Sequence, residues 1–363
     1  MIRLSSMNDT NILQLNIRQT EILEKIQPKK LVSSSEVFKL LDSGVSLVTV
    51  KRDLEYLVGL KYLERKGKGR STSYEKTTLG VLFSPIDPSK YNKTEPDMRS
   101  GRGDFNFSLF DEFPKNLFSV KEKEMLDVTT GRYREKIKSV SPVGQMKELE
   151  RFVIELSWKS SKIEGNTYTL LDTERLLREG IPAEGHTPDE TAMIINHKKA
   201  FSFILENIKE MRTNGITVPF IEKVHELLVA DLKVKRGLRS GLVGIIGTKY
   251  KPLDNKYQIK EALEGLCTAV NRMEGVFTKA FAVLVGISYI QPFEDGNKRA
   301  ARLLCNAVLL SSNYAPLSYR SVDEINYRES ILVFYEMNSL VPMKKIFIEQ
   351  YLFSAQNYLV NAP

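Results

Sequence analysis

The residues that decide the fold read Gln291-Pro292-Phe293-Glu294-Asp295-Gly296-Asn297-Lys298-Arg299-Ala300-Ala301-Arg302. An apolar run at 280–290 precedes them and helical spacing resumes after them, so the stretch predicts a loop between two helices. Gly296 permits a tight turn, and the first N–H groups of the second helix point into the loop. Helix N-termini favour anions, and Arg299 and Arg302 share one helix face. The stretch therefore predicts a site for phosphate groups.

Other side chains of the loop suit the same chemistry. Asp295 offers a carboxylate oxygen of the kind that Mg²⁺ prefers when it bridges phosphates. Asn297 can donate its amide to a phosphate, and Lys298 adds a positive charge. Phe293 is expected to be a buried anchor that shapes the loop. Each feature is common on its own, but their combination in one short stretch points to nucleotide binding.

The complete string resembles the signature of the Fic-domain family, His-Pro-Phe-x-Asp/Glu-Gly-Asn-Gly/Lys-Arg-x-x-Arg. Eight of the nine specified positions match, and the exception is Gln291, which stands where the family has its catalytic histidine. The resemblance implies an all-helical core, ATP and Mg²⁺ as ligands, and transfer of AMP to a hydroxyl group of a target protein. It assigns nucleotide binding to the remaining positions of the loop and the metal to its carboxylate: Gly296, Asn297, Lys298, Arg299 and Arg302, with Asp295 for Mg²⁺.

Gln291 puts turnover in question. Its amide has no usable basicity near neutral pH, and loss of a general base lowers a rate by about 10²–10⁴. The three histidines of the chain lie outside the loop, at positions 186, 197 and 225. Two interpretations stay open: an AMP-transferase with impaired turnover, and a non-catalytic regulator that senses a nucleotide. Lys298 also occurs in the Doc branch of the family, which resembles kinases, so phosphoryl transfer is a third.

A second segment, Ser160-Ser161-Lys162-Ile163-Glu164-Gly165, resembles the inhibitory motif Ser/Thr-x-x-x-Glu-Gly/Asn of the same family. It closes a predicted inhibitory helix near 146–166. By resemblance, Glu164 pairs with Arg302 and keeps that arginine from the γ-phosphate, while Ser160 steadies the loop and Gly165 completes the motif. A carboxylate competes with a phosphate for the same guanidinium donors. The resemblance therefore implies autoinhibition.

The stretch 241–252 alternates β-prone residues with glycines, which predicts a β-hairpin among helices. It resembles the family's flap, which docks an extended segment of a target by strand addition. Gly247, Thr248, Lys249 and Tyr250 are the expected docking residues, and a purely structural hairpin is the alternative.

Residues 10–80 predict a small α+β domain. Helical spacing at 17–26, N-cap serines at 33–35 and at Ser46, and a Gly-rich link at 67–70 between two β-prone runs resemble a winged helix-turn-helix. By that resemblance, Thr49, Lys51 and Arg52 face the DNA major groove. The wing contacts the DNA backbone through basic side chains, which are Arg65, Lys66, Lys68 and Arg70.

The charge of this region agrees with an anionic partner. Residues 1–80 carry 14 lysines and arginines against 9 aspartates and glutamates, in a chain of net charge +8. Winged helices also dock proteins, so a protein-contact role stays open beside DNA binding.

The sequence thus predicts a mainly α fold in three parts: a winged helix-turn-helix at 10–80, a connector at 81–119 and a Fic domain at 120–355. No apolar run is long enough to span a bilayer, the start lacks a signal peptide, and two cysteines make no disulfide framework. We therefore expect a cytoplasmic protein without a membrane partner. The resemblance also raises a homodimer as an expectation.

Overall fold

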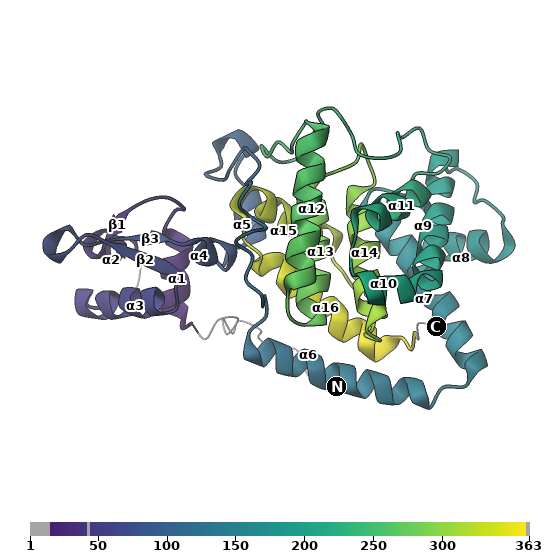
Figure 1. Ribbon diagram of the computed structural model, residues 1–363, viewed down its shortest axis with the longest axis horizontal. Coiled ribbons are helices and arrows are strands. Elements are labelled where there is room, and N and C mark those ends of the chain that lie inside the picture. The colour runs from purple at the N-terminus through teal and green to yellow at the C-terminus, as the bar shows by residue number, and fades with distance from the viewer. Residues whose placement is uncertain (1–14, 42–43, 361–363) are drawn as a thin grey trace.

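Two parts of unequal size make up the molecule (Figure 1). The computed structural model describes residues 15–41 and 44–360. We call residues 15–84 the head and residues 87–360 the body. Figure 1 shows the head beside one end of the larger, helical body.

The head combines short helices with a small three-stranded sheet. Its helices are α1 (Ile17–Lys25), α2 (Ser34–Leu40) and α3 (Leu47–Gly59), followed by the short α4 (Thr78–Leu82). Its strands are β1 (Val32–Ser33), β2 (Leu63–Lys66) and β3 (Ser73–Lys76), in the antiparallel order β1-β3-β2.

Local sequence explains where these elements begin. Ser33 caps α2 in a capping box with Glu36, and the Ser46 side chain accepts from the Thr49 N–H at 3.2 Å to start α3, as the serine pattern predicts. The link between β2 and β3 turns through Gly67 and Gly69, both at positive φ, with a single 3₁₀ turn at Gly69–Ser71. The predicted order of helices and hairpin is therefore present in the head.

The body is almost entirely helical. Its long helices are α6 (Val120–Lys138), α7 (Pro142–Ile163), α9 (Pro188–Glu206), α12 (Lys256–Arg272), α13 (Val276–Ile290), α14 (Asn297–Ser311), α15 (Glu324–Met337) and α16 (Val341–Asn357). Shorter ones are α5 (Pro88–Asn92), α8 (Leu170–Glu179), α10 (Ile208–Asn214) and α11 (Val218–Leu228), with a 3₁₀ turn at Pro96–Met98. The expected mainly α fold is confirmed.

Helix α13 lies at the centre of the body, packed against α12, α14 and α15 (Figure 1). All residues of 280–290 are buried, because this apolar run is covered on every side. None of the helices in the described part of the chain combines the length and apolar character that crossing a bilayer requires. The central helix thus places the loop that follows it in a rigid frame.

The predicted connector is packed onto the body. Arg99 forms a buried ion pair with Glu336 of α15 at 3.0 Å, and the Tyr91 hydroxyl donates to the same carboxylate at 2.7 Å. Head and body also share backbone bonds, since the Leu340 N–H donates to the Leu82 carbonyl at 2.8 Å. Residues 87–104 therefore belong structurally to the body.

Candidate functional site

The loop at 291–296 joins two buried helices through left-handed backbone at both ends. Gln291 ends α13 at φ 50°, and Gly296 precedes α14 at φ 78°. The free N–H groups at the start of α14 therefore face a cavity of about 440 Å³. This is the anion-binding geometry that the sequence predicts, with Gly296 at the turn.

Two groups fix the shape of the loop from within. The Asn297 side chain accepts from the Phe293 N–H and donates to the Phe293 carbonyl, both at 2.9 Å. The amide that we expected to donate to a phosphate is thus bonded inside the loop, where the nearest backbone groups satisfy it. Phe293 is the predicted buried anchor, and its ring stacks on His225 with centroids 3.6 Å apart.

His225, on α11, holds the loop through contacts of its imidazole ring. Its Nε2 lies 2.9 Å from the Asp295 carbonyl oxygen, so the N–H is on Nε2 because a carbonyl only accepts. Burial lowers the pKa of His225 to about 4, and the ring is neutral at physiological pH. His225 therefore fixes the backbone of the residue whose carboxylate faces the cavity. No sequence pattern predicts this role, because the histidine lies far from the loop along the chain.

The two arginines of α14 are buried, not exposed. Arg299 lies 3.4 Å from the mostly exposed Asp295 carboxylate. Arg302 donates through Nε to the Ser160 hydroxyl at 2.9 Å, through Nη2 to the Ser160 carbonyl at 2.8 Å, and through Nη1 to Glu164 at 2.9 Å. Every donor group of the Arg302 guanidinium is thus directed at the end of α7.

Glu164 is held by two cations. Its other oxygen accepts from Lys298 at 2.8 Å, and its side chain is 16% exposed. Burial alone would raise the pKa of Glu164, but the charges of Arg302 and Lys298 outweigh it and lower the pKa to about 2. Gly165 follows at φ 100°, a conformation that glycine adopts freely, so the chain turns away directly after the carboxylate. We call Glu164, Lys298 and Arg302 the latch.

Gln291 lines the cavity, and its side-chain amide nitrogen is bonded within the body. Its amide donates to the Ser288 carbonyl at 2.7 Å and lies 3.2 Å from the Tyr335 hydroxyl, and the residue is 6% exposed. Its carbonyl accepts from Arg239 at 2.7 Å. Arg239 and Tyr335 are further parts of the site that the sequence did not reveal, since neither has a motif around it.

The predicted hairpin is absent. Residues 241–252 form an extended loop without paired strands, and Lys251 makes only a single parallel bridge to Asp104. The segment's β-prone residues have no neighbouring strand to pair with, so alternation alone was misleading. The flap nevertheless borders the cavity through residues 243–246, and Ile246 is 97% exposed.

The residues expected to dock a target instead anchor the flap to the body. The Gly247 carbonyl accepts from Arg99 at 2.9 Å, and Thr248 donates to Glu336 at 2.7 Å. Lys249 donates to the Arg99 carbonyl, and the buried Tyr250 donates to the Tyr289 carbonyl at 2.9 Å. Their side chains are therefore committed to internal contacts, and the free part of the flap is 243–246.

Comparisons with known proteins agree with this geometry. Residues 215–309 match the model of the Fic/DOC family, so this part of the chain is a Fic/DOC domain. The fold is similar to a crystal structure of a Fic domain containing signaling protein from Bacteroides thetaiotaomicron, with a TM-score of 0.55 at 20% identity over 64% of this chain and 94% of that one. It is also similar to residues 134–508 of Fic-1 from Caenorhabditis elegans, with a TM-score of 0.56 at 20% identity over 66% and 71% of the two chains.

Two curated relatives are named protein adenylyltransferases. The chain is 26% identical over 219 residues to the protein adenylyltransferase Fic of Nematostella vectensis, which is 57% of this chain and 49% of the relative. It is 23% identical over 158 residues to the protein adenylyltransferase fic-1 of Caenorhabditis elegans, which is 43% of this chain and 31% of the relative. The matched part thus spans 31% to 49% of the length of these relatives.

Proposed function

We propose that this protein binds ATP in the cavity between the 291–296 loop and the flap, in the manner of a Fic-type AMP-transferase, and that Glu164 inhibits this binding. The latch is the observation that carries the proposal. Arg302, whose family counterpart meets the γ-phosphate by resemblance, is bound to Glu164 and Ser160. A buried carboxylate with a strongly lowered pKa is a direct competitor for a phosphate.

The rest of the loop supports triphosphate binding once Glu164 moves. The N-terminus of α14, Lys298 and Arg299 supply backbone donors and positive charge. The described residues contain no group of three or more acids, histidines or cysteines that could hold a metal ion. A single carboxylate suits Mg²⁺ when phosphates complete its shell, and Asp295 projects its carboxylate to solvent at the cavity. Mg²⁺ would neutralise phosphate charge there.

Turnover is impaired under this proposal. A target hydroxyl must lose its proton when it attacks the α-phosphate, and the Gln291 amide lacks the basicity to accept it. A target segment would lie along 243–246 of the flap, whose exposed edge is next to the loop. Positioning by the arginines and the helix N-terminus would still allow slow transfer.

Labelled ATP tests the proposal. The wild type, Glu164→Gly and Glu164→Gly/Gln291→His are incubated with α-labelled or γ-labelled ATP and Mg²⁺, and binding is measured by calorimetry in parallel. We expect Glu164→Gly to bind Mg-ATP more tightly than the wild type, and the double variant to transfer label from the α-phosphate only. No nucleotide binding by a folded Glu164→Gly variant would refute the proposal.

A second candidate is a non-catalytic nucleotide sensor. It is favoured by Gln291, whose amide cannot act as a general base and is bonded to Ser288 and Tyr335. Binding without label in any variant would select this function. Label from the γ-phosphate alone would select the phosphoryl transfer that Lys298 raised in the sequence.

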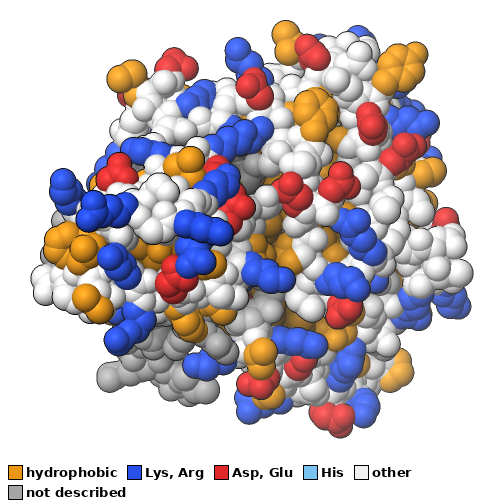
Figure 2. All heavy atoms as spheres, turned by 60° about the vertical axis from the view of Figure 1, so that its left-hand side comes forward, with side chains coloured by type: hydrophobic (Ala, Val, Ile, Leu, Met, Phe, Trp, Pro, Cys, Tyr) orange, Lys and Arg blue, Asp and Glu red, His pale blue; other side chains and the backbone are white. Residues whose placement is uncertain are grey.

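For the head we propose DNA binding. Lys51 and Arg52 on α3, and Lys68 and Arg70 at the wing, are exposed and form no ion pair among the described residues, whereas Lys66 pairs with Glu64 and Glu75. Figure 2 turns the head forward and shows lysine and arginine side chains gathered on that face. Unpaired surface cations of this kind are suited to phosphate contacts.

A salt titration tests DNA binding. Affinity for duplex DNA from around the protein's own gene should fall steeply with salt, and Lys51→Ala/Arg52→Ala should reduce both affinity and the salt slope. Lys209→Ala, on the distant α10, is the control and should change neither. An affinity independent of salt would exclude phosphate contacts and favour a protein partner for the head.

A further inference from the structure

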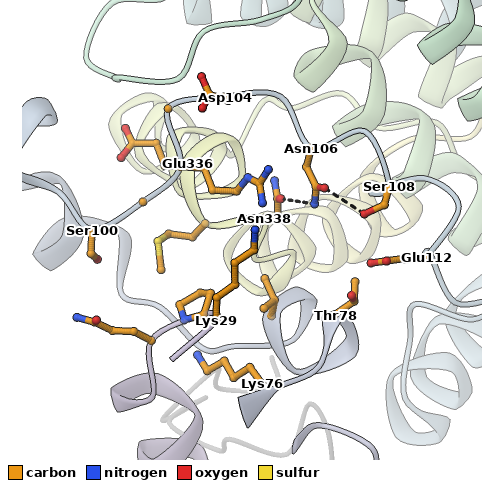
Figure 3. Close-up of a pocket in the computed structure, with 17 residues that line it drawn as sticks. Lys29, Lys76, Thr78, Ser100, Asp104, Asn106, Ser108, Glu112, Glu336 and Asn338 are labelled. Carbon is orange, nitrogen blue, oxygen red and sulfur yellow. Dashed lines mark hydrogen bonds between the residues drawn. The ribbon is translucent and has the colours of Figure 1, made fainter. Parts of the chain in front are cut away.

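A second cavity, of about 590 Å³, lies between the head and the body. The head contributes the turn at 27–29, the end of β3 and the start of α4, and the body contributes residues 100–108 and the end of α15. Figure 3 shows Lys29 reaching from the head toward Asn338, with Lys76 below it on the same side of the cavity. Ligand sites often form at domain interfaces and have volumes of roughly 300–1,000 Å³.

Lys76 is the first unusual feature of this cavity. It is only 7% exposed, although lysine is almost never buried without a charged partner. Its amino group donates to the Ser84 hydroxyl at 2.7 Å, and no carboxylate in the described part of the chain lies within ion-pair distance. Burial lowers the pKa of Lys76 to about 7, with a small opposing effect from Glu24. The protein therefore buries an amine that has a hydroxyl partner and no carboxylate partner among the described residues.

Arg102 is the second unusual feature of this cavity. Its backbone N–H donates to the Glu336 carbonyl at 2.7 Å, which fixes the residue at the cavity wall. Its Nε is buried and has no hydrogen-bond partner among the described residues. A buried donor without an acceptor costs free energy unless a ligand satisfies it. Two basic side chains thus line one cavity: Lys76 has no carboxylate partner among the described residues, and Arg102 has an unpaired Nε.

The acidic residues nearby do not cancel these charges. Glu336 is engaged by Arg99, Tyr91 and Thr248. Asp104 and Glu112 are exposed, and Asp104 projects away from the cavity in Figure 3.

We propose that the cavity between head and body binds a small molecule that carries a phosphate or carboxylate group, with Lys76 and Arg102 as the anion-binding residues. Lys29 closes the site from the head. The amides of Asn106 and Asn338, which are already bonded to each other at 3.0 Å, offer hydrogen bonds to the remainder of the ligand. The volume exceeds that of a bare ion and accommodates a metabolite of moderate size.

The position of this site connects it to the flap. The segment that lines the cavity at 100–104 also holds the flap, since the Lys251 N–H donates to the Gly103 carbonyl at 2.7 Å and Arg99 donates to the Gly247 carbonyl at 2.9 Å. A ligand that orders this segment stabilises the base of the flap from the opposite side. The inference is independent of AMP transfer, because it needs only the cavity and its two cations.

Thermal unfolding with inorganic phosphate and with citrate, against chloride at equal ionic strength, tests the proposal. A ligand of the native state raises Tm in a saturable way. We expect saturation by at least one of the two anions, and the one that binds more tightly identifies the class. Lys76→Met and Arg102→Met each remove one charge-assisted bond and should weaken the apparent Kd by about tenfold or more. Lys209→Met, an exposed lysine of α10, should leave it unchanged.

Hydrogen exchange separates this site from the nucleotide loop, which also attracts phosphate. The expected result is anion-dependent protection at 76–81 and 100–108 that Lys76→Met abolishes. Protection confined to 293–299, equal Tm shifts in chloride, or an unchanged Kd in both Lys76→Met and Arg102→Met would each overturn the proposal. Two variants are needed because either substitution alone could perturb folding.

Discussion

At the scale of single residues, the ion pairs of Glu164 with Lys298 and Arg302 predict how stability depends on pH. The pKa of Glu164 is lowered to about 2 from its ordinary 4.5. A carboxylate whose pKa is lower in the folded state stabilises that state above its unfolded pKa, and the contribution is lost as pH falls through the folded pKa. Glu164→Gln should therefore lower the free energy of unfolding by about 3 kcal/mol at pH 7.

Urea unfolding of both proteins between pH 7 and pH 3 measures this contribution. The difference between wild type and Glu164→Gln should be constant above pH 5 and should fall to about half near pH 3. Other carboxylates titrate in both proteins and cancel in the difference. A difference that is absent at pH 7 would show that Glu164 is not held by Lys298 and Arg302 in solution.

The buried His225 predicts that stability also depends on pH in a second range. Its pKa is about 4 when folded and near 6.5 when unfolded, so only the unfolded chain binds a proton between these values. Stability should fall as pH drops from 6.5 to 4, by up to about 1.4 kcal/mol per pH unit from this residue.

His225→Phe keeps a ring against Phe293 and removes the titration, so it should flatten this slope. Burial also lowers the pKa of His197, which contributes in the same direction, and part of the slope should remain. The measurement is unfolding free energy against pH for both proteins. An identical slope in His225→Phe would show that the ring is not buried and neutral as described.

At the scale of elements, the packing of α13 on α12 depends on Gly286. A Cβ added there would lie 2.5 Å from a Leu266 methyl carbon in the buried interface. Gly286→Ala should destabilise the protein by about 1–3 kcal/mol through overpacking. Gly265→Ala on α12 has no atom within 4 Å of the new Cβ and should be neutral or stabilising by about 0.5–1 kcal/mol. Thermal melts that rank the two variants in the opposite order would contradict this packing.

The sequence predicted those elements whose signals are local. Ser46 marks the start of α3, and the 280–290 run marks the buried α13, because capping and apolar periodicity act over a few residues. The Glu164–Arg302 contact was also anticipated, through the order of motifs rather than through periodicity.

What the sequence could not predict depends on distant partners. Arg239 supports the Gln291 carbonyl and Arg99 holds the flap, and neither sits in a recognisable pattern. The hairpin at 241–252 was predicted wrongly, because β-prone residues form strands only where another strand can pair with them. Asn297 bonds within its loop since Phe293 offers both a donor and an acceptor at the right spacing.

At the scale of the whole molecule, Arg99 and Glu336 connect the segment after the head to the body. Both are buried, so removing one partner leaves an uncompensated charge. Arg99→Met should cost about 3–5 kcal/mol and should increase hydrogen exchange at 247–251. Arg99→Met/Glu336→Gln should recover part of the stability, because the stranded charge is gone. Equal losses in the single and the double variant would show that the ion pair is not the cause.

The Glu336 carboxylate also limits how far the body can be truncated from its N-terminal side. A shortened protein beginning at residue 120 would lack Tyr91 and Arg99, and the Glu336 carboxylate would keep only the Thr248 hydroxyl of its three side-chain partners. Such a fragment should be poorly soluble, whereas one beginning at Asp87 retains both partners. We therefore expect the smallest unit that folds by itself to begin near residue 87, well before the loop at 291–296.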